Sequence, residues 1–112
     1  MEVTTTRAGD RITVIAVCGQ IDMQTAGQLQ DAVHAALDVP VPRIVLDLAD
    51  VGFCDSTGLS VFVYGHRHST NRGGFLRLAA PTAFLTRVLT VVGIAQQIPV
   101  FDTVAAAVEA KE

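Results

Sequence analysis

Residues 43–63 read RIVLDLADVGFCDSTGLSVFV, in which an apolar, β-branched run gives way to a helical pattern. The run Arg43–Leu48 is almost continuously apolar, which is typical of a strand buried inside a parallel sheet. After Asp55 the apolar side chains recur at helical spacing and share one face: Leu59, Phe62 and Val63. A buried strand that leads into a helix is a unit of α/β domains, so this stretch predicts that fold class.

Two further strands are predicted upstream of this unit. Arg11–Gly19 (RITVIAVCG) carries apolar side chains on both alternating faces, and Val3–Arg7 is a weaker strand. Gly9-Asp10 between them suits a tight turn. The chain is therefore expected to open with a β-hairpin.

A first helix is predicted after this hairpin. Its apolar positions recur at helical spacing, at Ala26, Leu29, Val33, Ala36 and Leu37. Either Asp22 or Thr25 is placed to cap its N-terminus. Pro40 and Pro42 stop the helix before the buried strand begins.

Downstream, the alternation of helix and strand continues. The helix that starts after Asp55 is expected to end at Asn71–Gly74, where two glycines stand together. Strands are predicted at Phe75–Ala79 and at Ile98–Phe101. Pro99 favours an edge position for the last strand, because proline cannot donate a ladder hydrogen bond.

Two more helices complete the pattern. Pro81 suits a first helical position and Gly93 a helix end, and the apolar stripe between them consists of Leu85, Val88, Leu89 and Val92. Asp102 or Thr103 is expected to cap a last helix, which carries Val104, Ala105 and Val108.

The predicted order is β-β-α-β-α-β-α-β-α. This alternation indicates one α/β domain over residues 1–112, with a mixed, mostly parallel sheet of four to five strands and about four helices.

Composition excludes several classes of function. A formal net charge of −3 with 17% charged residues offers no basic surface for nucleic acid. No window reaches the roughly 18 apolar residues of a membrane span, so we expect a cytoplasmic protein without membrane contact. Cys18 and Cys54 do not form a close-spaced pair and have no neighbouring histidine at metal-ligand spacing, so both are interpreted as buried thiols in a reducing compartment.

The segment Asp55-Ser56-Thr57-Gly58 sits at the predicted start of a helix. The positive end of a helix dipole would stabilise a phosphate on Ser56 by on the order of 1 kcal/mol. Such a phosphate adds about −1.5 to −2 charge beside Asp55, which would repel an acidic or apolar partner. The alternative is that these residues only cap the helix.

A nucleophilic serine is not indicated. Ser56 lies outside a G-x-S-x-G elbow, and the three histidines, His34, His66 and His68, come with no evident partner geometry. The sequence therefore predicts a binding module with no catalytic residue, no metal and no cofactor of its own.

Several short motifs occur in one order along nearly the whole chain. They are Gly19–Asp22, Thr25-Ala26, Ile44–Leu48, Val51–Leu59, Arg72–Gly74, Val88-Leu89, Val92–Ile94 and Pro99–Asp102. Together they resemble the STAS family, named for sulfate transporters and anti-sigma factor antagonists. The similarity is to the anti-sigma factor antagonists in particular.

The resemblance implies a partner-switching role in transcription regulation, such as a bacterial stress response. Ser56 would be phosphorylated by a partner that is both anti-sigma factor and serine kinase, with Thr57 as a secondary candidate. The unphosphorylated form would bind the kinase and release the sigma factor, and a serine phosphatase would restore that form. ATP and Mg²⁺ would belong to the kinase.

Residue roles follow from the same resemblance. Asp22 is expected near the phosphorylated serine and in contact with the kinase, a role that is compatible with helix capping. Asp55 is expected to orient the serine, and Gly58 to permit close backbone approach. Gln20 departs from the glutamate usual in the family, so one negative charge is missing from the expected partner-binding surface.

Two alternatives stay open. The chain could be an unphosphorylated STAS scaffold subunit of a signalling or lipid-transport complex, in which Ser56 serves as a cap only. Cys54 beside the site invites a redox hypothesis, against the interpretation of a small core residue.

Overall fold

The structure is a computed structural model that describes residues 1–9 and 11–111. In this part of the chain one sheet has five strands, in the order β1 (Glu2–Ala8), β2 (Ile12–Ile21), β3 (Arg43–Cys54), β4 (Phe75–Ala79) and β5 (Val100–Phe101). β1 runs antiparallel to β2, and the other neighbours are parallel. The predicted mixed sheet with an opening hairpin is confirmed; Asp10 of the predicted turn lies outside the described residues.

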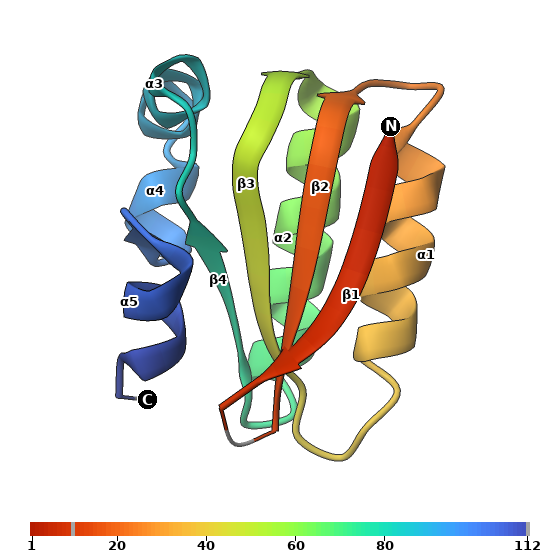
Figure 1. Ribbon diagram of the computed structural model, residues 1–112, viewed down its shortest axis with the longest axis vertical. Helices are drawn as coiled ribbons and strands as arrows, with labels where there is room; N and C mark the ends of the chain where they lie inside the picture. Colours follow the sequence, from red (N-terminus) through yellow and green to blue (C-terminus); the bar gives the residue numbers. More distant parts are fainter. Residues whose placement is uncertain (10, 112) are drawn as a thin grey trace.

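The helices form the outer layers of the domain. Those described are α1 (Ala26–Ala36), α2 (Ser56–Thr70), α3 (Ala83–Val91), α4 (Ile94–Gln97) and α5 (Val104–Glu109). Figure 1 shows α1 and α2 side by side behind β1, β2 and β3, with α3, α4 and α5 beside β4. The short helix α4 was not predicted; it follows Gly93, which adopts a φ of 83°.

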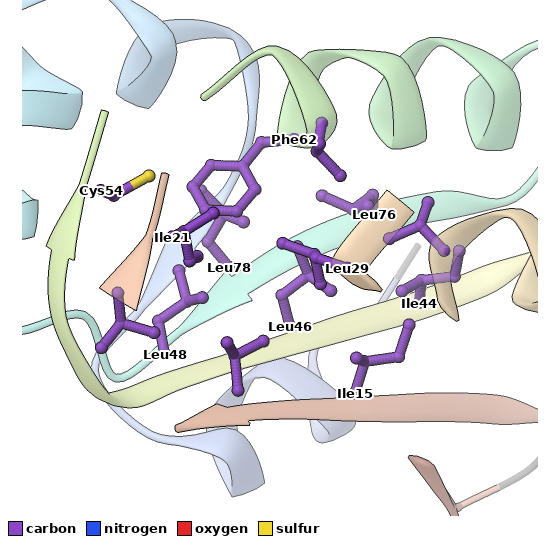
Figure 2. Packing of buried hydrophobic residues seen from close by; sticks show 14 of the residues in the cluster. Ile15, Ile21, Leu29, Ile44, Leu46, Leu48, Cys54, Phe62, Leu76 and Leu78 are labelled. Carbon is purple, nitrogen blue, oxygen red and sulfur yellow. The ribbon is translucent and has the colours of Figure 1, made fainter. Parts of the chain in front are cut away.

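The main core lies between the sheet and the α1–α2 layer. Figure 2 shows Phe62 of α2 close to Ile21 and to leucines of the central strands, and all of these side chains are buried. Val45 lies between two residues of this core in β3, so its side chain points to the opposite face, where it packs in a smaller cluster with Ala107 of α5. Both faces of the sheet are therefore covered by helices at its centre.

Strand β3 is longer than predicted and reaches Cys54 without an intervening loop. Its pairing with β2 shifts register between Ala16 and Cys18 and again after Gly19, and then continues to the pair Ile21 and Cys54. These irregularities carry both strands to a common carboxyl end, where the predicted site residues follow.

The buried face of α2 differs from the prediction. Phe62 is buried, but Leu59 and Val63 are only half-buried. The buried positions of the helix are Gly58, Val61, Phe62, Gly65 and Ser69. Because three of these are small or polar, the apolar pattern alone pointed to a neighbouring face.

Helix caps agree with the sequence in part. Thr103 caps α5 by accepting a hydrogen bond from the Ala106 amide at 3.0 Å, which settles the choice between Asp102 and Thr103. In α3 the cap is Thr82, so Pro81 precedes the helix and does not occupy its first position. The last strand lies at the predicted edge of the sheet, but it spans only Val100–Phe101, so Pro99 precedes it.

The expectation that both cysteines are buried is wrong for Cys18. This side chain is exposed, whereas Cys54 is buried. Cys18 lies on the face of β2 that α5 covers only near Ile12 and Val14, so the far end of that face stays open.

None of the described helices combines the length and apolar character that crossing a membrane requires.

Candidate functional site

The candidate site lies at the common carboxyl end of β2 and β3. The Asp55 amide donates a hydrogen bond to the Ile21 carbonyl oxygen at 3.0 Å, which ties the start of α2 to the end of β2. The loop after Ile21 contains Asp22, and α2 begins directly after Asp55. Two segments far apart in sequence, 22–25 and 55–58, therefore lie at the same end of the sheet.

Asp55 is the N-cap of α2. Its Oδ1 accepts hydrogen bonds from the Thr57 amide at 2.9 Å, from the Gly58 amide at 3.4 Å and from the Thr57 hydroxyl. The bond from the Thr57 hydroxyl is the main cause of a lowered pKa of Asp55, and the amides of Thr57, Gly58 and Met23 lower this pKa further. The cap is thus an ionised carboxylate held by its own helix. Its side-chain bonds go to Thr57 and Gly58, and the role of Asp55 in orienting Ser56 stays a prediction.

Ser56 and Thr57 differ in what their hydroxyls do. Ser56 is the first residue of α2 and is exposed, and the described part of the chain supplies no hydrogen-bond partner for its Oγ. Its carbonyl oxygen accepts a bond from the Ser60 hydroxyl at 2.9 Å. Thr57 is half-buried, and its hydroxyl donates a hydrogen bond to Asp55. Of the two, only Ser56 presents a hydroxyl to solvent, and Ser56 is not the helix cap.

Asp22 organises the other loop. Its Oδ1 accepts from the Gln24 amide at 2.9 Å and the Thr25 amide at 3.1 Å, while the Asp22 amide donates to the Thr25 hydroxyl at 2.9 Å. Thr25 is the N-cap position of α1 but makes no side-chain bond to the first turn. Asp22 therefore holds the turn that leads into α1. The prediction that the side chain of Asp22 or Thr25 caps the helix is wrong, because neither accepts a hydrogen bond from an amide of its first turn.

Gly58 allows α2 to approach the strand ends. A Cβ at this position would lie 2.6 Å from Cys54 Sγ and 2.6 Å from Ile21 Cγ2, well inside contact distance. The expected close approach at Gly58 is thus present. Burial raises the pKa of the Cys54 thiol to about 12, with a contribution from the Asp55 charge, so the thiol stays protonated at neutral pH.

Large apolar side chains are also exposed on elements that carry the site, and the sequence motifs do not point to them. Met23 is 80% exposed, Phe53 42% and Phe84 44%, and the rings of Phe53 and Phe84 stack with centroids 6.2 Å apart. Burial does not alternate at this end of β3: Val51 and Cys54 are buried, and Phe53 between them is exposed. Strand periodicity therefore could not have revealed Phe53. Met23 adjoins Asp55 through its amide, and exposed apolar side chains of this size are a feature of binding surfaces.

Comparison with known proteins identifies relatives of this chain. The STAS domain family matches residues 4–107. A protein of Thermotoga neapolitana, named as a candidate anti-sigma factor antagonist homologue, is 33% identical over 67 residues, which is 60% of this chain and 59% of that protein. The chain thus spans less than two thirds of the length of this curated relative.

Solved structures agree over almost the whole domain. A candidate anti-sigma factor antagonist of Thermotoga maritima has a TM-score of 0.88 at 24% identity, covering 96% of this chain and 92% of that one. An anti-sigma factor antagonist of Mycobacterium paratuberculosis has a TM-score of 0.82 at 28% identity, covering 95% and 91%.

A more distant structure is the phosphorylated form of the Bacillus cell fate determinant SpoIIAA. It has a TM-score of 0.68 at 18% identity, covering 88% of this chain and 90% of that one, and the likeness extends to the fold alone.

Proposed function

The chain belongs to the STAS domain family, and we propose that it is an anti-sigma factor antagonist switched by phosphorylation of Ser56. In this proposal the unphosphorylated domain binds an anti-sigma factor that is also a serine kinase, and so frees the sigma factor. Transfer of the γ-phosphoryl group of ATP to Ser56 Oγ weakens the complex and leaves ADP. A serine phosphatase restores the binding form. The domain itself acts by binding.

The observation that carries this proposal is the contrast between two adjacent hydroxyls. Ser56 Oγ is exposed at the first position of a 15-residue helix, while the Thr57 hydroxyl is held by Asp55. A kinase needs a hydroxyl that can enter its active site without breaking the helix. Ser56 meets that requirement, and we keep Thr57 only as the secondary acceptor.

Phosphorylation would change charge more than fold. The phosphate adds about −1.5 to −2 charge, and the helix N-terminus stabilises it where it stands. Asp55 is already ionised next to it, and Met23 and Phe53 form an apolar surrounding. A partly apolar surface that already carries the Asp55 charge thereby becomes strongly anionic, which opposes a partner that buries it.

The relatives support the same assignment. The Mycobacterium paratuberculosis and Thermotoga structures carry the name anti-sigma factor antagonist, and SpoIIAA has been solved in both unphosphorylated and phosphorylated forms. In this chain we assign Asp22 and Gly58 to the partner-binding surface together with residues 55–57. Asp22 follows Ile21, whose carbonyl oxygen accepts a hydrogen bond from the amide of Asp55, the N-cap of α2.

The test is phosphorylation by the anti-sigma factor kinases of the same genome, with the modified residue mapped by mass spectrometry. We expect one phosphate on Ser56 and none on the Ser56→Ala variant. Ser60→Ala is the matched control, because Ser60 is an exposed serine one helical turn further along α2. It should be modified as wild type is.

Two results would contradict the proposal. Modification of Thr57 with Ser56 untouched would move the switch to the hydroxyl that Asp55 holds. No modification by kinases that are active on a control substrate would favour an unphosphorylated scaffold subunit instead.

A further inference from the structure

A groove runs along α2 from Ser56 toward the C-terminal end of the helix. It has a volume of about 530 Å³ and is lined on the opposite side by Val92 and Ile94, at the junction of α3 and α4. Its α2 wall includes Leu59 and Val63, which are half-buried, and Leu59 also packs against the edge of the main core. The groove is therefore apolar along its middle.

The far end of the groove is cationic. Arg67 and His68 line it there, about 16 Å from Ser56 at 1.5 Å of helix rise per residue. Arg67 is exposed, makes no ion pair with the described chain, and no acidic side chain lines the groove. A ligand carboxylate would thus meet a free guanidinium without repulsion from the wall.

The wall of the groove is held in place by contacts between α1 and α2. The Tyr64 hydroxyl lies 3.3 Å from His34 Nδ1, and its ring lies against that of His68 with centroids 4.3 Å apart. Tyr64 therefore forms a fixed ridge along the groove. A preformed wall lowers the entropic cost of binding.

We propose that this groove holds an apolar segment of the anti-sigma partner, with a partner carboxylate paired to Arg67. The inference rests on the proposed function and extends its contact surface from the helix start to residue 67. Ser56 lies at one end of the same groove, so a phosphate there adds negative charge to a site that binds an acidic segment. The groove thereby couples the switch to a surface some three helical turns long.

The test is isothermal titration calorimetry of each anti-sigma factor kinase of the genome against wild type and Arg67→Glu. We expect charge reversal to weaken binding roughly tenfold or more, because it sets like charges together. Arg87→Glu is the matched control: Arg87 is exposed on α3 and outside the groove, and its affinity should stay within about twofold of wild type. Circular dichroism checks that both variants fold.

A charge swap tests the carboxylate directly. Replacing the acidic groove residue of the partner by lysine should restore binding to Arg67→Glu while weakening binding to wild type. Failure of every acidic-to-lysine partner variant to rescue Arg67→Glu would overturn the pairing.

The remaining outcomes separate this proposal from the switch. If a kinase binds wild type and Arg67→Glu equally, the groove proposal is overturned and the proposed Ser56 switch still stands. If no kinase binds folded wild type, the proposed function fails and the groove proposal fails with it. Sedimentation that shows a dimer lost in Arg67→Glu would assign the groove to a second copy of the chain and overturn the proposal.

Discussion

At the residue scale, the site separates two roles that the sequence motif leaves mixed. Asp55 carries the capping of α2, which frees the neighbouring Ser56 hydroxyl. A hydroxyl that capped the helix could be modified only by breaking that cap. Because Asp55 caps the helix and Ser56 does not, Ser56 can be modified while the helix stays folded.

This division predicts unequal effects of two alanine substitutions. Asp55→Ala removes the acceptor for the Thr57 and Gly58 amides and should lower the urea midpoint of unfolding. Ser56→Ala removes an exposed hydroxyl without a partner and should stay within about 0.5 kcal/mol of wild type. A larger loss in Ser56→Ala than in Asp55→Ala would show that the serine is the cap after all.

The lowered pKa of Asp55 predicts a dependence of stability on pH. Because folding favours the ionised carboxylate, its contribution is complete above the ordinary value of 3.8 and is lost as pH falls through the lowered pKa. The stability difference between wild type and Asp55→Asn should therefore shrink when urea unfolding at pH 7 is repeated at about pH 3. A difference that is constant between these pH values would argue against an ionised cap.

The two cysteines are expected to react at very different rates. Cys18 is exposed, while Cys54 is buried with a pKa of about 12. With a thiol-specific chromogenic reagent at neutral pH, native protein should show one fast thiol, and the second should appear only on unfolding. A fast phase that persists in Cys18→Ser would revive a redox role for Cys54.

At the scale of elements, helix α2 depends on glycine where it meets the strand ends. A methyl group on Gly58 would collide with Cys54 and Ile21. Gly58→Ala should therefore destabilise the domain by roughly 1–3 kcal/mol, the usual effect of overpacking a core. Gly27→Ala in α1 is the control, because a Cβ there meets nothing within 4 Å.

Chemical denaturation of the two glycine variants measures this difference. Gly27→Ala should be neutral or stabilising by up to about 1 kcal/mol, since alanine favours the helix. Equal stability of Gly58→Ala and Gly27→Ala would contradict the close approach of α2 to the strands.

Element by element, apolar periodicity located the long helices and the buried strands, because those patterns depend on neighbours in sequence. It failed where small residues face the core, as at Gly65 and Ser69 of α2, and it overlooked the four-residue helix α4. It also could not show that β3 runs on to Cys54. That extension depends on the irregular pairing with β2, which is a property of two strands and not of one.

At the scale of the whole molecule, the site exists because β2 and β3 end together. The sequence motifs indicated Asp22 and residues 55–58 separately, and the family resemblance placed them near one another. Parallel pairing of Ile21 with Cys54 supplies the physical reason. The groove beside α2 could not be predicted, because Val92 and Ile94 reach it only through the packing of α3 and α4.

The central claim is that a phosphate on Ser56 switches off partner binding by charge while the fold stays intact. The most direct measurement is the affinity of the anti-sigma factor kinase for the unphosphorylated and the Ser56-phosphorylated domain, by calorimetry, with circular dichroism of both forms. We predict matching spectra and an affinity lower by roughly tenfold or more after phosphorylation. Equal affinities for the two folded forms would contradict the account.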